Sequence, residues 1–155
     1  MTKKKKSRAS RDAVRVQNGA LRAARLSAIK TDILDNLRQP TLSIHAVAHR
    51  HGISARYIRQ LFTADGASFA DFVLDRRLAA VHLMLSDVRF AARTISAIAF
   101  EVGFGDVSEF SRVFRRRYGA TPSDVREAAR LKSANRPAPP LQANSENDRG
   151  CDGRN

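Results

Sequence analysis

The sequence contains one eleven-residue pattern twice, as SIHAVAHRHGI at residues 43–53 and as TISAIAFEVGF at residues 94–104. Both copies follow Ser/Thr-Ile-x-Ala-Val/Ile-Ala-x-x-x-Gly-Ile/Phe, and their first residues lie 51 positions apart. The last alanine of each pattern is small enough for two helices to cross at close range. The glycine four residues later can adopt the positive φ of a tight turn. This is the spacing of a helix-turn-helix, and two matches in register predict two such units in one chain.

The segment after each glycine has the apolar spacing of an amphipathic helix. Its inward face would be formed by Ile58, Leu61 and Phe62 in the first copy and by Phe110, Val113 and Phe114 in the second. The opposite face would then be free to enter a major groove of DNA. The alternative is a helical hairpin repeated for packing alone. Arginines and other hydrogen-bond donors on the outward face argue against it, because they suit bases and phosphates.

The rest of the central segment also has helical periodicity, without a strand pattern. Large apolar residues recur at three- and four-residue steps at Leu26, Ile29, Ile33, Leu34 and Leu37, and this helix must end before Pro40. Residues suited to N-caps precede the later helices: Ser43, Ser54, Ser68, Thr94, Asp106 and Thr121. The phenylalanines at 62, 69, 72, 100, 104, 110 and 114 fall on core spacing. The sequence therefore predicts an all-α fold of about seven helices.

Charge and composition divide the chain into three parts. The 155 residues carry a net charge of +13, and residues 1–30 contribute ten basic residues against one acidic residue. We predict a disordered basic arm over 1–20, a folded domain over 21–131 and a disordered tail over 132–155. Because residues 31–130 are nearly balanced in charge, binding of an anionic polymer by the domain must depend on the local placement of arginines.

The chain resembles the AraC/XylS family of bacterial transcription regulators over about residues 33–130. The matching residues are Ser54-x-x-Tyr57-Ile58-x-x-Leu61-Phe62, Gly66, Phe69, Arg77-Leu78, Ile98-Ala99-x-x-x-Gly103-Phe104, Phe110-Ser111-Arg112-x-Phe114, Gly119-x-Thr121-Pro122-Ser123 and Arg126. The resemblance implies two helix-turn-helix subdomains joined by a long linking helix over roughly 69–86, which read two successive major grooves. Val81 and His51 depart from the pattern without disrupting it. Many members have an effector-binding and dimerisation domain before the match, and we expect that the 30 mostly disordered residues here cannot form one.

The resemblance also places the DNA contacts. Base contacts are implied at Arg56, Arg59, Gln60, Ser108, Glu109 and Arg112. Arginine suits guanine, glutamine suits adenine, and glutamate can accept from cytosine. We expect phosphate contacts at Ser43, Thr94, Ser111, Arg115 and Arg116. Capping by itself also explains Ser43 and Thr94, and a solvated helix end also explains the two arginines.

The expected function is that of a sequence-specific regulator of transcription that binds double-stranded DNA. The resemblance implies action near promoters, more often activation through contact with RNA polymerase than repression. Without a dimerisation domain we expect a monomer. Two alternatives stay open: a nonspecific nucleic-acid-coating protein driven by the basic arm, and a truncated regulator that lacks its effector domain.

Other classes of function find little support in the sequence. His45 and His49 have a spacing that can hold zinc, but they lack a third ligand at a suitable spacing. No nucleophile has a His and carboxylate arrangement near it, so we expect no enzyme, no metal and no cofactor. Cys151 is the only cysteine, which excludes an intrachain disulfide and favours a reducing cytosol, with the protein on the nucleoid. No apolar run is long enough to span a bilayer.

Overall fold

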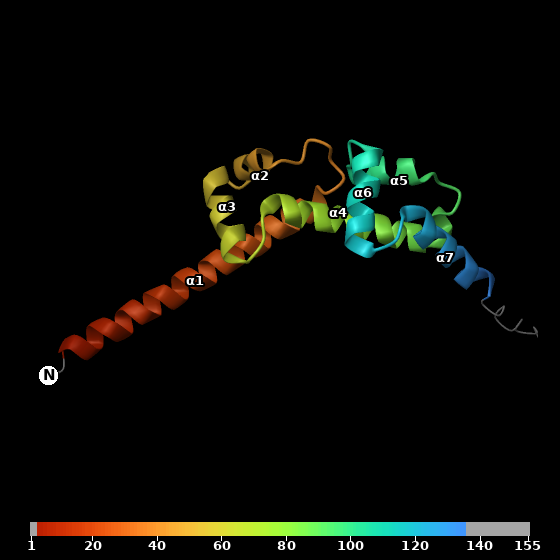
Figure 1. Ribbon diagram of the computed structural model, residues 1–155. Coiled ribbons are helices and arrows are strands. Elements are labelled where there is room, and N and C mark those ends of the chain that lie inside the picture. The colour runs from red at the N-terminus through yellow and green to blue at the C-terminus, as the bar shows by residue number, and fades with distance from the viewer. Residues whose placement is uncertain (1–2, 136–155) are drawn as a thin grey trace, which may run out of the picture.

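The computed structural model describes residues 3–135, and the side-chain surroundings of residues 14–135. Over this range the chain forms seven α-helices and one 3-10 turn, and no strand. The elements are α1 (Lys3–Asp35), α2 (Ile44–Arg50), α3 (Ala55–Ala64), α4 (Phe69–Ser86), η1 (Val88–Phe90), α5 (Ile95–Val102), α6 (Val107–Tyr118) and α7 (Pro122–Ala134). The predicted all-α fold is confirmed. The helix pairs α2–α3 and α5–α6 lie toward opposite ends of α4, which is the predicted linking helix (Figure 1).

All six predicted N-caps are confirmed. In each, a side-chain oxygen accepts a hydrogen bond from the backbone N–H three residues later, at donor–acceptor distances of 2.7–3.2 Å. The first N–H groups of a helix have no partner within the helix, so these side chains supply one. Because each cap joins residues only three positions apart, the sequence by itself indicates where these helices begin.

The described part of the molecule has two hydrophobic cores, one in each helix-turn-helix unit. The first contains Ile29, Ile33 and the predicted inward residues of α3. The second contains the inward residues of α6 and the buried residues of α5. The linking helix serves both, because Val73 belongs to the first core and Leu78 to the second. Each helix-turn-helix unit is thus packed around apolar side chains of its own.

Two apolar residues expected in the core lie at the surface. Phe100 is 52% exposed and Leu34 is 48% exposed. The buried residues of α5 are Ile98, Ala99 and Val102, so Phe100 points away from them. Leu34 similarly lies beside the buried stripe formed by residues 29, 33 and 37 of the chain. In both cases the apolar residue is next to the core-facing stripe of its helix but not on it.

Helix α1 begins much earlier than expected. The sequence predicted a disordered arm over residues 1–20, whereas α1 runs without interruption from Lys3. Residues 3–20 are rich in Lys, Arg and Ala, all good helix formers, with Gly19 as their only glycine and no proline. The first half of α1 therefore projects from the rest of the molecule as a helix (Figure 1). At the other end α7 extends to Ala134, into the expected tail, and residues 136–155 of that tail lie outside the described residues.

Candidate nucleic-acid interface

The first unit presents α3 with its polar face to solvent. Arg56, Arg59 and Gln60 are all exposed, while Ile58 is fully buried on the opposite side of the helix. The turn before α3 has the predicted form, because Gly52 adopts a φ of 62°. The N–H of the next residue then donates to the Ala48 carbonyl at 3.0 Å, which closes the corner between α2 and α3.

The second unit repeats this arrangement with α6. Ser108, Glu109 and Arg112 are exposed on one side of the helix, and Phe110 is fully buried on the other. Gly103 has a φ of 103°. The N–H of the following residue donates to the Ala99 carbonyl at 3.0 Å. The six predicted base-contacting residues therefore form two exposed faces, one on each unit.

The five predicted phosphate-contacting residues divide into three kinds. Ser43 and Thr94 are exposed, and the hydroxyl oxygen of each caps its helix. Ser111 is half-buried, and its hydroxyl donates to the Val107 carbonyl at 2.8 Å, so it is turned toward its own helix. Arg115 and Arg116 are exposed.

An open hollow gathers part of this set at the second unit. Arg112, Arg115 and Arg116 line it together with Thr121 and Ser123 at the start of α7. The adjacent Arg117 points elsewhere, because its Nε lies 3.2 Å from an oxygen of Asp75. Three of the four arginines of α6 are thus gathered on one cationic surface.

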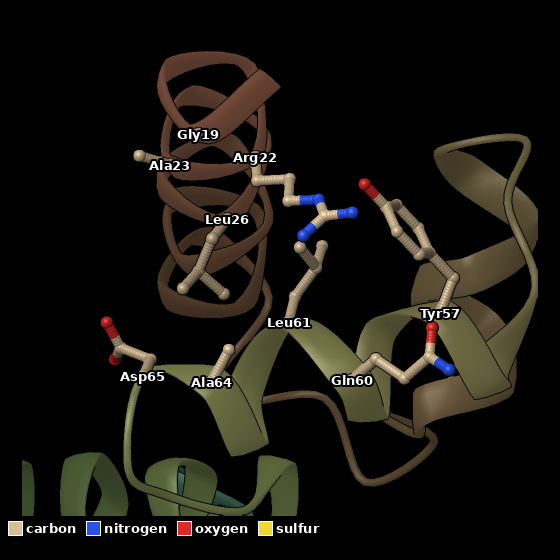
Figure 2. Close-up of a pocket in the computed structure, with 9 residues that line it drawn as sticks. All are labelled: Gly19, Arg22, Ala23, Leu26, Tyr57, Gln60, Leu61, Ala64 and Asp65. Atoms are coloured by element: carbon tan, nitrogen blue, oxygen red, sulfur yellow. The ribbon is translucent and has the colours of Figure 1, made fainter. Parts of the chain in front are cut away.

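A second hollow lies between α1 and α3, and the sequence did not indicate it. It is a cavity of about 500 Å³, and Figure 2 shows Arg22 of α1 reaching toward Tyr57 and Leu61 of α3. Gln60, a predicted base contact, lines the same cavity. The Arg25 guanidinium lies 5.9 Å from the centre of the Tyr57 ring, a distance typical of a cation–π contact. The projecting helix therefore brings a cation to the edge of the first exposed face.

One signal would have found Arg22. Arg15, Arg22 and Arg25 are spaced by seven and three residues, which places them on one side of a helix. The predicted boundary between arm and domain at residue 20 separated Arg15 from Arg22 and Arg25. Of these, Arg22 lines the cavity beside Gln60 and Arg25 contacts Tyr57, so both lie next to the exposed face of α3.

Arg77 of α4 lies at the junction of the two units. Its side chain is half-buried and its guanidinium donates to two backbone carbonyls of the α1–α2 connection. Burial lowers the pKa of Arg77 from its ordinary value, because desolvation disfavours the charged form. The sequence identified this residue only as part of a family resemblance.

The histidines of the first unit have separate surroundings. His45 and His49 are exposed, and His51 lies 3.2 Å from Asp32, which also accepts hydrogen bonds from Arg50. Among the described residues, no three His, Cys, Asp or Glu side chains gather into a group that could hold a metal ion. None of the helices within residues 3–135 has the length and apolar character needed to cross a membrane.

Comparison with known proteins shows similarity to transcription regulators. A family described as "Helix-turn-helix domain" matches residues 47–128. The transcriptional activator RhrA of Rhizobium meliloti is 42% identical over 106 residues, which cover 68% of this chain and 33% of RhrA. The regulatory protein SoxS of Escherichia coli K12 is 37% identical over 93 residues, which cover 59% of this chain and 83% of SoxS. The chain thus matches about a third of RhrA but most of SoxS.

Solved structures agree with the sequence comparisons. A probable AraC family transcriptional regulator from Rhodopseudomonas palustris superimposes with a TM-score of 0.58 and 31% identity, covering 65% of this chain and 93% of that one. An AraC-type regulator from Chromobacterium violaceum has a TM-score of 0.63 at 24% identity, covering 71% and 96%. The second likeness concerns the fold alone.

Proposed function

Because the chain belongs to the AraC/XylS family of transcription regulators, we propose that it is a sequence-specific regulator that binds double-stranded DNA. In this proposal α3 and α6 enter two successive major grooves on one side of the duplex. The observation that carries it is the pair of exposed polar faces, each on a unit with its own core and both joined to the single helix α4. Successive major grooves recur about every 34 Å along DNA, so a fixed pair of helices can read both.

The proposed base contacts divide between the two helices. In α3, Arg59 and Arg56 would donate to guanine, and Gln60 would form a bidentate pair with adenine. In α6, Arg112 would read guanine and Glu109 would accept from a cytosine amino group, with Ser108 able to contact either kind of base. The exposure of all six side chains supports these roles.

The proposed phosphate contacts surround these reading positions. Arg115 and Arg116 extend the hollow lined by Arg112 and are well placed for the backbone beside the second groove. Ser43 and Thr94 would meet phosphate at the N-termini of α2 and α5, where unpaired N–H groups also favour an anion. For Ser111, which donates to its own helix, a phosphate contact requires the hydroxyl to rotate away.

The names of two relatives support a proposal about the direction of regulation. RhrA of Rhizobium meliloti and NphR of Rhodococcus are transcriptional activators by name. We propose activation through contact with RNA polymerase at the nucleoid in the cytoplasm, by a chain that binds DNA as a monomer. The rival proposal of nonspecific coating draws its support from the basic helix α1, and the experiment below separates the two.

The test is selection of the full chain on a random double-stranded DNA pool at near-physiological salt with excess competitor polyanion. We expect enrichment of a two-part motif whose halves lie about one helical turn apart. Recovery of an unenriched pool would contradict sequence-specific binding and favour coating.

Single variants then assign the motif to side chains. Arg59→Ala should relax one half of the motif and Arg112→Ala the other, each costing about 1–3 kcal/mol of binding free energy on the selected site. Arg117→Ala is the matched control on α6, because that side chain pairs with Asp75. An unchanged motif in both reading variants would contradict the assigned roles.

A further inference from the structure

The two units of this molecule are joined more loosely than each is packed internally. The buried residues divide into two clusters, and the division falls on α4 between Val73 and Leu78. A cavity of about 340 Å³ lies where the units face one another. Leu42 and Val73 line it from the first unit, and Gly103 and Glu109 line it from the second. Packed apolar side chains therefore do not fill the space between the two units at this place.

Arg77 bridges that space. It lies on α4 between the last residue of the first core and the first residue of the second. Its Nε donates to the Leu37 carbonyl and its Nη2 to the Gln39 carbonyl, each at 3.1 Å. Both acceptors follow the C-terminus of α1, where backbone carbonyls lack helical partners. The planar guanidinium is thereby held to the first unit by two hydrogen bonds in a fixed direction.

The other side of the same guanidinium touches the second unit at Gly103. A Cβ atom placed on this glycine would lie 2.8 Å from Nη2 and 2.9 Å from Cζ of Arg77. Such a distance is shorter than van der Waals contact, so the turn of the second helix-turn-helix rests directly against the arginine. At the equivalent turn of the first unit, a Cβ on Gly52 would meet nothing within 4 Å. The close approach is thus particular to the second turn.

A second polar contact crosses between the units nearby. Arg38, in the connection after α1, lies 3.1 Å from Oε1 of Glu101 on α5, and Arg93 pairs with the other oxygen of that carboxylate. The Arg38 side chain is 69% exposed. Exposed ion pairs contribute little because water screens them. The half-buried Arg77, with its two backbone acceptors, is the stronger link.

We propose that Arg77 is a positioning residue that sets the distance and angle between α3 and α6. It ties the α1–α2 connection to the Gly103 turn, and so holds the two units as one rigid body. By fixing this geometry, Arg77 would also determine which spacing of two DNA half-sites the protein prefers. This last step rests on the proposed function. Without the link each unit would keep its core, but α6 would rotate relative to α3 about the linking helix.

The first test needs no DNA. Spin labels are placed at Ala64→Cys on α3 and Ala97→Cys on α5, both exposed positions, in the full chain with Cys151→Ser. Electron spin resonance then measures the distance distribution between the labels. We expect Arg77→Met to broaden and shift this distribution. Arg76→Met is the matched control: it removes the neighbouring arginine of the same helix, which is exposed.

The second test measures spacing on DNA carrying the selected two-part site. Two linked reading units gain affinity from binding together, and lose it where their geometry forbids simultaneous contact. When two base pairs are inserted between the halves, the wild type and Arg76→Met should lose about tenfold or more in affinity, and Arg77→Met less than about threefold. On the unaltered site Arg77→Met should bind more weakly than the control.

These outcomes separate the two proposals. If the wild type selects no two-part motif, the proposed function fails, and the spin-label distances still decide the role of Arg77. If Arg77→Met matches Arg76→Met in both distance distribution and spacing tolerance, the positioning role is overturned. The circular dichroism spectrum of each variant verifies that it folds. Should Arg77→Met not fold, Arg77→Lys replaces it against Arg76→Lys, because one ammonium does not reproduce the guanidinium fork. An unbroadened distribution in Arg77→Lys would then overturn the proposal.

Discussion

Two glycines at equivalent places in the repeat have different surroundings. Gly52 and Gly103 both lie in the turn after the first helix of a unit and have a positive φ, as their common pattern predicts. Gly52 faces open space, whereas Gly103 rests against the guanidinium of Arg77. The same residue type thus serves a turn in one copy and both a turn and a contact between units in the other.

This difference predicts unequal costs for the same substitution. Gly52→Ala should lower the free energy of unfolding by about 1 kcal/mol, because a side chain disfavours positive φ. Gly103→Ala should cost at least about 1 kcal/mol more, since the new methyl group displaces Arg77 from its two hydrogen bonds. Urea denaturation followed by circular dichroism measures both. Equal losses would mean that the guanidinium moves aside without cost.

At the scale of elements, each helix is delimited by local chemistry. Helix α7 has the most complete start, because Thr121 and Asp124 form a reciprocal capping box and Pro122 occupies the first turn. The Thr121 oxygen accepts from the Asp124 N–H at 3.2 Å, and the Thr121 N–H donates to the Asp124 carboxylate at 2.8 Å. This cap fixes the entry of α7, which packs along the linking helix and contributes Val125 to the second core.

Removing the cap should weaken α7 and with it the second unit. We expect Thr121→Ala to lower the free energy of unfolding by about 1 kcal/mol, since one N–H at the helix start loses its partner. Ser123→Ala is the control, because this serine is an exposed residue of the same first turn. Urea denaturation gives the stability, and hydrogen exchange shows whether the α7 amides open first. A loss as large in Ser123→Ala would contradict the role of the cap.

The whole molecule is asymmetric in charge and in shape. Helix α1 extends past the first unit and carries arginines along one side, and Arg22 reaches the cavity that Gln60 also lines. A basic helix beside the first reading face would strengthen contact with flanking DNA without reading its sequence. The positive charges of Arg15, Arg22 and Arg25 are then carried on one side of a helix.

The expected effect of this surface is on affinity and salt dependence. Arg22→Gln should weaken binding equally on the selected site and on unrelated DNA, and should reduce the slope of log affinity against log salt by about 1. Lys132→Gln is the control, because it removes an equal charge at the exposed end of α7. Titrations at several salt concentrations measure both slopes. A change confined to the selected site would instead indicate that Arg22 reads a base.

Local signals in the sequence were sufficient for much of the fold. Caps such as Ser54 and Thr94, the turns at Gly52 and Gly103, and the bounds of the linking helix all depend on residues within a few positions of one another. The hydrogen bonds and backbone angles that form these caps and turns involve only neighbouring residues, so they could be predicted. The exposure of Arg59 and Arg112 followed from the same helical period, although their roles toward bases stay predictions.

Tertiary structure decided what depends on distant residues. Whether Phe100 enters the core depends on which side of α5 the second unit covers, and the packing of α1 against α3 brings Arg22 to the edge of α3. Arg77 is the clearest case, because its two acceptors lie about 40 residues before it and Gly103 lies 26 residues after it. A periodic pattern records which side of a helix is apolar, but not which distant backbone will meet a polar side chain. These contacts of Arg77 form only when both units are packed against α4.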